Sequence, residues 1–187
     1  MMNRVPKLLA VIDYQNDFVT GSLGFEGAAA IDDGIARLAQ TYLAQGDHVL
    51  FTYDTHDDLY LETREGRALP IPHCNPNETG WRLYGKTQAL CCETCANHQI
   101  HTVCKHTFGM PPAELVKLGQ ELPGLREIMV VGVVTNMCVL SNAVLLQAQW
   151  PEAQITVDAA LCRSFDPVLH EKTLDVMQGL QMAVINR

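Results

Sequence analysis

Three side chains suited to nucleophilic catalysis each follow an apolar run of the sequence. Asp13 ends the run at residues 7–12, Lys105 ends a weaker run, and Cys138 lies just beyond the strong run at residues 128–134. A carboxylate can take the proton of a thiol, and an ammonium group stabilises the thiolate that forms. The three residue types therefore predict a cysteine nucleophile, provided that the fold brings them together.

Cys138 lies near the expected start of a helix over residues 136–149. Thr135 or Asn136 can serve as the N-cap of that helix. Because a helix N-terminus lowers the pKa of a thiol, we expect Cys138 to be more acidic than an ordinary cysteine. The alternative is a small core residue, which is the usual role of a free cysteine beside an apolar run.

Two further polar residues, Asp54 and His56, follow the apolar run at residues 48–53. Alternate residues of an extended strand point to the same side, so the two side chains are expected to face one way. His73 follows in the next segment of the chain. Carboxylate oxygen and imidazole nitrogen are ligands for zinc, manganese or iron, which makes these residues candidate metal ligands.

Six apolar runs alternate with helical patterns. The runs are at residues 7–12, 48–53, 100–104, 128–134, 154–157 and 182–185, and the helical patterns are at residues 28–44, 112–118, 136–149 and 167–179. Continuous apolar runs indicate strands buried on both faces, and their alternation with helices is typical of a parallel sheet covered on both sides. We therefore expect a three-layer α/β/α fold with a doubly wound, mostly parallel, six-stranded sheet.

The candidate residues share one position relative to this sheet. Ligands of open α/β sheets bind beyond the carboxyl ends of the strands, near the point where the strand order reverses. Asp13, Asp54, His56, Lys105 and Cys138 all follow strand ends. The sequence therefore predicts that a carboxylate, a carboxylate with an imidazole, an ammonium and a thiol converge at one edge.

Length and composition limit the classes of protein. A chain of 187 residues with 48% hydrophobic residues has the size of one domain, and we expect residues 1–187 to form a single one. The net charge of −8 is distributed without a basic stripe, which argues against nucleic acid as a partner. No apolar run has the length of a signal-peptide core or a membrane span, so we expect a cytoplasmic protein with no membrane partner.

The segment at residues 55–99 breaks the alternation of strands and helices. It is rich in Pro, Gly, His and Cys, and predicts a long loop over the top of the sheet, where loops are usually functional. A single C-x-x-C, Cys92 to Cys95, lies beside Cys91 in this segment. The seven cysteines and the absence of a secretion signal favour buried reduced thiols in a helix, with a structural zinc site or a redox pair as alternatives.

Three stretches together resemble a known family. They are Asp13-Tyr14-Gln15-Asn16-Asp17-Phe18 with Gly21 and Leu23, then Lys105, and Gly132-Val133-Val134-Thr135-Asn136-Met137-Cys138-Val139. In type and order they resemble the signature segments of the isochorismatase-like cysteine hydrolases, which include the nicotinamidases. The resemblance runs from about residue 7 to the C-terminus. It implies a triad of Asp13, Lys105 and Cys138, an oxyanion hole of the Val134 and Cys138 backbone N–H groups, and a cis peptide between Val133 and Val134.

The same resemblance implies a divalent metal ion. In nicotinamidases the positions that match Asp54, His56 and His73 hold zinc, manganese or iron, and we expect zinc here, with manganese or iron as alternatives. Some relatives add a fourth ligand, for which Glu65 is the candidate and Glu62 the reserve. Three protein ligands and water leave an open position for the ring nitrogen of a substrate.

The predicted activity is hydrolysis of a small planar amide, such as nicotinamide, to an acid and ammonia through a thioester. Phe18 and Trp81 are candidate walls for the planar substrate. The family pattern carries an aromatic residue where Thr55 stands, so another small amide, a carbamoyl compound or the isochorismate vinyl ether are alternative substrates. A non-catalytic binding module and a thiol redox protein are alternatives of other classes. By resemblance, we also expect a homo-oligomer.

Overall fold

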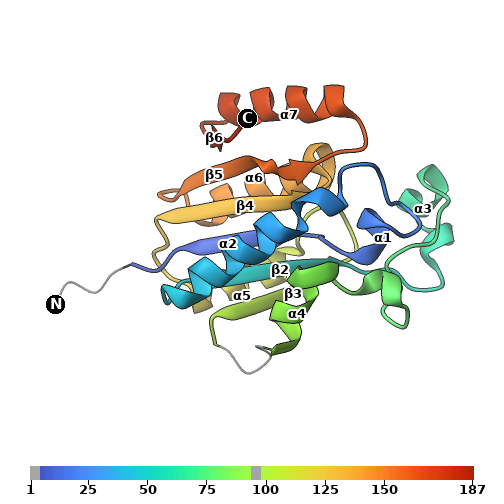
Figure 1. Cartoon of the computed structure of the whole chain (residues 1–187), viewed down its shortest axis with the longest axis horizontal. Coiled ribbons are helices and arrows are strands. Elements are labelled where there is room, and N and C mark those ends of the chain that lie inside the picture. Colours follow the sequence, from blue (N-terminus) through green and yellow to red (C-terminus); the bar gives the residue numbers. More distant parts are fainter. Residues whose placement is uncertain (1–4, 94–97) are drawn as a thin grey trace.

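The protein, analysed as a computed structural model, is described for residues 5–93 and 98–187. Its centre is a six-stranded sheet of parallel strands in the order β3-β2-β1-β4-β5-β6 (Figure 1). The strands are β1 (Leu8–Ile12), β2 (His48–Asp54), β3 (Ile100–Lys105), β4 (Glu127–Val133), β5 (Gln154–Arg163) and β6 (Ala183–Ile185). The predicted α/β fold and its doubly wound parallel sheet are confirmed.

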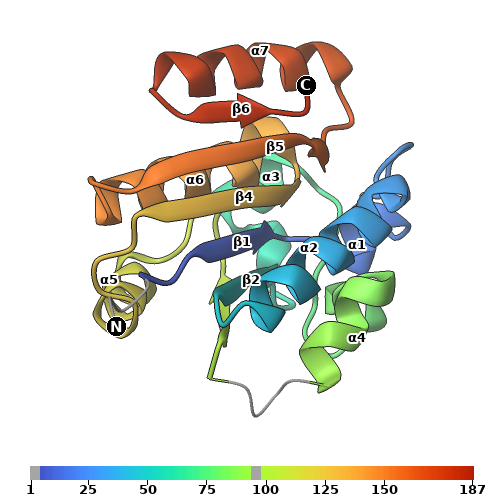
Figure 2. The same cartoon turned by 60° about the vertical axis from the view of Figure 1, so that its left-hand side comes forward.

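Helices cover both faces of this sheet. The α-helices of the described chain are α1 (Asn16–Val19), α2 (Asp32–Ala44), α3 (Arg64–Ala68), α4 (Gly85–Glu93), α5 (Pro112–Glu121), α6 (Leu140–Gln149) and α7 (Pro167–Gly179). Helices α2 and α4 lie on one side of the sheet and α5 and α6 on the other, while α7 lies along β6 at the edge (Figure 1; Figure 2). No helix in the described part of the chain is long and apolar enough to cross a bilayer.

Strand β1 shows why these residues form a central strand. All five of its residues are buried, and alternate side chains enter the two halves of the core. Leu9 and Val11 pack in the half beneath α2, whereas Ala10 and Ile12 pack in the half beneath α5 and α6. A strand with apolar neighbours on both faces has no solvent side, which explains the continuous apolar run.

The strand order reverses between β1 and β4, and Gly132 lets these two strands approach closely. Gly132 has φ +119°, and a Cβ placed on it would lie 2.2 Å from the backbone oxygen of Ile12. Only glycine combines this conformation with this contact. Asp13 follows β1 and Cys138 follows β4, so both candidate residues lie at the reversal, where α/β proteins bind ligands.

The segment at residues 55–99 contains more regular structure than the sequence indicates. Besides α3 and α4, it forms short 3-10 turns at Tyr60–Glu62 and Thr79–Trp81. The Asp32 carboxylate of α2 accepts hydrogen bonds from the backbone N–H groups of Lys86 and Thr87 at the start of α4. This stabilising contact comes from a distant part of the chain, which explains why the local pattern indicated a helix near Cys91 but not the start of α4 at Gly85.

Candidate active site

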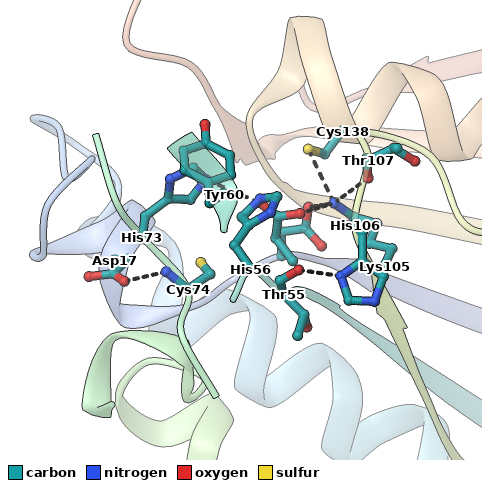
Figure 3. Close-up of polar contacts among 12 residues, drawn as sticks. Asp17, Thr55, His56, Tyr60, His73, Cys74, Lys105, His106, Thr107 and Cys138 are labelled. Carbon is teal, nitrogen blue, oxygen red and sulfur yellow. Dashed lines mark hydrogen bonds and ion pairs between the residues drawn. The ribbon is translucent and has the colours of Figure 1, made fainter. Parts of the chain in front are cut away.

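Asp13, Lys105 and Cys138, the candidate triad, come together at the carboxyl ends of three strands. The Lys105 Nζ atom lies 2.6 Å from Asp13 Oδ2. The same atom lies 3.6 Å from Cys138 Sγ (Figure 3). It also donates to the backbone oxygen of Thr107 at 3.0 Å. Asp13 and Lys105 are fully buried, and Cys138 is nearly so. The predicted convergence of these three side chains is therefore present in the structure.

The position of Asp13 is fixed by its own backbone and by Thr52 of β2. Asp13 has a positive φ of 46°, which is uncommon outside glycine and turns the chain sharply after β1. Its backbone N–H donates to Thr52 Oγ1 at 3.0 Å, and that hydroxyl donates to Asp13 Oδ1 at 2.6 Å. The second oxygen, Oδ2, is thereby left to face Lys105.

Burial sets the protonation of the candidate triad. Loss of hydration raises the pKa of the Asp13 carboxyl above 3.8, against the opposing effect of Lys105. Burial also raises the pKa of the Cys138 thiol well above 9.0, and the charges of Asp13 and Asp54 add to this effect. The pKa of Lys105 lies well above 10.5, because the neighbouring carboxylates outweigh its own desolvation. The resting arrangement is a neutral thiol beside a charged ammonium group.

The prediction of an acidic Cys138 is therefore wrong. Cys138 lies in a π-helical segment, Thr135–Val139, whose N-cap residue is Val134. The predicted capping residues bind elsewhere: Thr135 Oγ1 pairs with His170 Nδ1, and Asn136 Oδ1 accepts a hydrogen bond from Ser164. Burial beside two carboxylates outweighs any effect of the helix end on the thiol.

The peptide bond between Val133 and Val134 is cis, as the family resemblance implies. Val134 follows directly after β4, and both Val134 and Cys138 line the same cavity. Their backbone N–H groups are the candidates for the oxyanion hole.

Asp54, His56 and His73 form a second cluster, here called the metal group. One ligand atom from each residue lies within 4.8 Å of the others, and all three residues are buried. Asp54 Oδ2 is 3.0 Å from His56 Nε2 and 3.3 Å from His73 Nε2. His73 Nδ1 is 2.8 Å from the backbone oxygen of Ile71, which can only accept, so Nε2 is the nitrogen left for a metal. The donor set and the histidine orientation fit a divalent metal ion.

The Asp54 carboxylate connects the metal group to the candidate triad. Its Oδ1 atom lies 3.1 Å from Lys105 Nζ, while Oδ2 faces the two histidines. Burial would raise the pKa of Asp54, but hydrogen bonds from His56 and His73 and the charge of Lys105 lower it below 3.8. The Gln15 side chain forms two hydrogen bonds with the Asp54 backbone. Gln15 Nε2 donates to the backbone carbonyl oxygen of Asp54, and Gln15 Oε1 accepts from the backbone N–H of Asp54.

The proposed fourth ligands lie at different places. Glu65 of α3 lines the same cavity as Asp54 and His73, and burial raises the pKa of its carboxyl above 4.5. Its oxygens are outside the cluster of three ligand atoms. Glu62 is exposed. The Tyr60 ring packs against both histidines, with its centre 4.3 Å from that of His56 and 4.9 Å from that of His73 (Figure 3).

Asp17 holds the backbone next to His73 of the metal group by a hydrogen bond, a role that the sequence did not indicate. Asp17 Oδ2 accepts a hydrogen bond from the backbone N–H of Cys74 at 2.7 Å, next to the candidate ligand His73 (Figure 3). A Cβ on Gly80 would lie 2.2 Å from the same oxygen. The second signature aspartate thus fixes the segment that carries His73.

A cavity of about 550 Å³ opens beside the candidate triad and the metal group. Phe18 lines it, as predicted, and packs edge-on against His73 with ring centres 5.6 Å apart. Trp81 is not among the lining residues; its ring packs on Tyr53, and its Nε1 donates to Thr55 Oγ1. Further lining side chains that the sequence did not indicate are Leu23, Phe25, Phe108, Met137 and Phe165.

The other cysteines form no such arrangement among the described residues. Cys74, Cys104 and Cys162 have free thiols, and the metal group is the one set of three potential ligands in this part of the chain. Cys91 belongs to α4, and its Sγ atom lies 3.4 Å from the Tyr53 hydroxyl oxygen. Cys95 and the side chain of Cys92 lie outside the described residues, so the C-x-x-C stays a prediction.

Comparison with known proteins decides the family. A family model described as an isochorismatase domain matches residues 7–187. The chain belongs to the isochorismatase family. A relative from Bacillus subtilis, described as an uncharacterized isochorismatase family protein PncA, is 30% identical over 141 residues, which are 74% of this chain and 76% of that protein.

Solved structures of this family superpose on nearly the whole chain. The nicotinamidase PncA of Bacillus subtilis is 29% identical with a TM-score of 0.85, over 95% of this chain and 98% of that one. The pyrazinamidase/nicotinamidase of Streptococcus mutans is 26% identical with a TM-score of 0.86, over 96% and 99%. The pyrazinamidase of Pyrococcus horikoshii, solved in complex with zinc, shares the fold at 19% identity, with a TM-score of 0.78 over 97% and 99%.

Proposed function

We propose that this isochorismatase family protein is a cysteine amidohydrolase that converts a small planar carboxamide of the nicotinamide type to the acid and ammonia. The observation that carries the proposal is the Lys105 ammonium group, which lies 2.6 Å from Asp13 and 3.6 Å from the Cys138 thiol. The relatives named nicotinamidase and pyrazinamidase support the substrate class.

In the proposed reaction Asp13 takes the proton of the Cys138 thiol, and both side chains lie beside the Lys105 ammonium group. The sulfur attacks the amide carbon, and the tetrahedral oxyanion receives hydrogen bonds from the backbone N–H groups of Val134 and Cys138. Asp13 then gives its proton to the leaving nitrogen, so that the C–N bond breaks, ammonia departs and a thioester remains. Lys105 compensates the negative charge of the thiolate and the carboxylate throughout.

The second half of the reaction reverses the roles. Asp13 takes a proton from water, and the hydroxide attacks the thioester carbon. The C–S bond breaks, the carboxylic acid leaves, and the proton returns to Cys138. One buried carboxylate thus serves as base and acid in both halves, which fits a pKa raised by burial toward the working pH.

Asp54, His56 and His73 would hold a divalent metal ion, with zinc as the first candidate. When bound, such an ion supplies an electrophilic position for a ring nitrogen of the substrate. The nucleophile comes from Cys138 in either case.

The test is ammonia release from nicotinamide, pyrazinamide and benzamide by metal-replete protein, with Cys138→Ala measured in parallel. Release by the wild type alone supports the proposal. No release from any amide would contradict it and favour a vinyl ether substrate or a binding module. Activity that persists in Cys138→Ala would contradict the thioester route.

A further inference from the structure

The cavity beside Cys138 is much more apolar than the reaction requires. The side chains of Leu23, Phe25, Phe108, Met137 and Phe165 line it. Its volume of about 550 Å³ falls within the range of roughly 300–1,000 Å³ found for pockets that enclose drug-sized ligands. A carboxamide with a single ring is smaller than such a ligand and leaves part of this apolar wall uncovered.

The charges around the cavity disfavour anionic substrates. Among the described lining residues there is no Lys or Arg, whereas Asp54 and Glu65 contribute carboxylates. Lys105 is fully buried and already faces Asp13 and Asp54. The two carboxylates also offset the charge of a divalent ion at the metal group. A substrate carboxylate placed away from the metal group would therefore lose its hydration without gaining a Lys or Arg partner among the described lining residues.

Phe165 is held at the edge of the cavity by its two neighbours. Phe165 as a whole residue is 58% exposed, although an aromatic residue normally avoids water. Ser164 donates to Asn136 Oδ1 at 2.6 Å, and Asp166 caps the first turn of α7 through the N–H groups of residues 168 and 169. The Phe25 ring packs edge-on against Phe165 at 6.2 Å. An exposed ring fixed on both sides offers a preformed contact surface.

We propose, on the basis of the proposed function, that the preferred substrates are neutral carboxamides whose acyl group extends as an apolar or aromatic body beyond a single ring. Phe25 and Phe165 contact that extension, while the amide carbon lies at Cys138. Substrates with a carboxylate on the acyl group are disfavoured by Asp54 and Glu65.

Three matched substrates test this inference: nicotinamide, quinoline-3-carboxamide with a second fused ring, and nicotinamide carrying a carboxylate at ring position 5. We expect kcat/KM of metal-replete protein to be about tenfold higher for the fused amide than for nicotinamide, which is the scale of added apolar contacts in a pocket. The carboxylated amide should be at least about tenfold poorer than nicotinamide.

Phe165→Ala should remove most of the preference for the fused amide, measured as the ratio of kcat/KM for the fused amide to kcat/KM for nicotinamide. Val176→Ala is the matched control, since Val176 is also an exposed apolar residue of the α7 region but does not line the cavity. Equal rates on the fused amide and nicotinamide, or good turnover of the carboxylated amide, overturn the inference while the proposed function stands. Hydrolysis of none of the three overturns the proposed function, and this inference with it.

Discussion

The candidate triad is buried and held from several sides, whereas the three rings of the aromatic rim, Phe25, Phe108 and Phe165, are partly open to solvent. The triad residues are set by the ends of β1, β3 and β4, which hydrogen bonds across the sheet keep in register. The rim residues come from connections that follow α1, β3 and β5.

This difference separates reactivity from selectivity. Strand ends are rigid, so they can hold charged groups at fixed distances in a buried site. Loops vary more freely, and their side chains contact the part of a substrate that does not react. Changes in the triad should therefore alter kcat and stability, while changes in the rim should alter the choice of substrate.

The largest effect is expected for Cys138→Ala. Loss of the nucleophile should lower the rate of amide hydrolysis by at least about 10⁴-fold, the scale seen when a nucleophile is removed. The control is Cys162→Ala, another buried thiol, which packs in the core away from the cavity. Its kcat/KM should stay within about twofold of the wild type, and an equal loss in both variants would show that the effect is structural.

Lys105→Met should reduce both rate and stability. The variant leaves the buried carboxylates of Asp13 and Asp54 without their ammonium partner, which costs roughly 3–5 kcal/mol of unfolding free energy when a buried pair is broken. We expect kcat to fall by about 10²–10⁴-fold. Denaturant unfolding with Lys86→Met as control checks this, because the Lys86–Asp33 pair is exposed to solvent and contributes little to the free energy of unfolding. Equal unfolding free energies in the two variants would contradict it.

Asp17→Asn should weaken metal binding without removing a ligand. An amide in place of the carboxylate disturbs the hydrogen bond to Cys74 and thus the position of His73. Supporting residues of this kind change metal affinity by about 10–100-fold. Competition of zinc with a chelator measures the affinity, and Asp32→Asn is the control, since Asp32 is a buried carboxylate that holds α4 instead. Equal affinities in both variants would exclude this role.

The pH profile of kcat/KM should report the buried triad. Only ionised Asp13 can accept the thiol proton, and burial raises the pKa of the Asp13 carboxyl above 3.8. The acid limb of kcat/KM should therefore have an apparent pKa higher than 3.8. Below that pKa, kcat/KM should fall about tenfold per pH unit. On the alkaline side, activity should persist beyond pH 9.0, because the pKa of Cys138 is raised. An acid limb at or below pH 3.8, with the fold checked by circular dichroism, would contradict this assignment.

The smallest effect on the fold is expected for Phe108→Ala at the rim. Phe108 is exposed, so the free energy of unfolding should change by less than about 0.5 kcal/mol. The kcat/KM for an apolar amide should still fall by a few fold. Thermal unfolding and substrate kinetics together check the contrast with Lys105→Met. A large loss of stability would place Phe108 in the core and weaken the comparison of the two regions.

The sheet and its catalytic edge were predictable because both follow from local patterns. The apolar runs before Asp13 and Asp54 are buried strands, and the weaker run before Lys105 is the partly exposed edge strand β3. Parallel strands bring their ends to one edge by geometry alone. The start of helix α4 was not predicted, because Asp32, far away in the sequence, stabilises its first turn. The apolar run predicted that the fifth strand ends at residue 157. Strand β5 instead continues to Arg163, beyond an irregularity in its pairing with β4.

The candidate site was predictable in its residues but not in its environment. The pKa of Cys138 was expected to be lowered, because the sequence does not reveal how deeply the thiol is buried or that two carboxylates face it. The rim residues Phe25, Phe108 and Phe165 belong to segments without a periodic pattern, so nothing marked them as neighbours. A homo-oligomer and a cytoplasmic location stay predictions.

Gly132 has a practical consequence for engineering. At Gly132, strand β4 lies against the backbone of Ile12 in β1. Because Gly132 has no side chain, β1 and β4 can lie this close together, and this spacing places Asp13 after β1 near Cys138 after β4. A library that randomises Phe25, Phe108 and Phe165 can search for new substrates on an intact reaction centre. The same library extended to Gly132 would mostly sample displaced strands, so this position should be held constant.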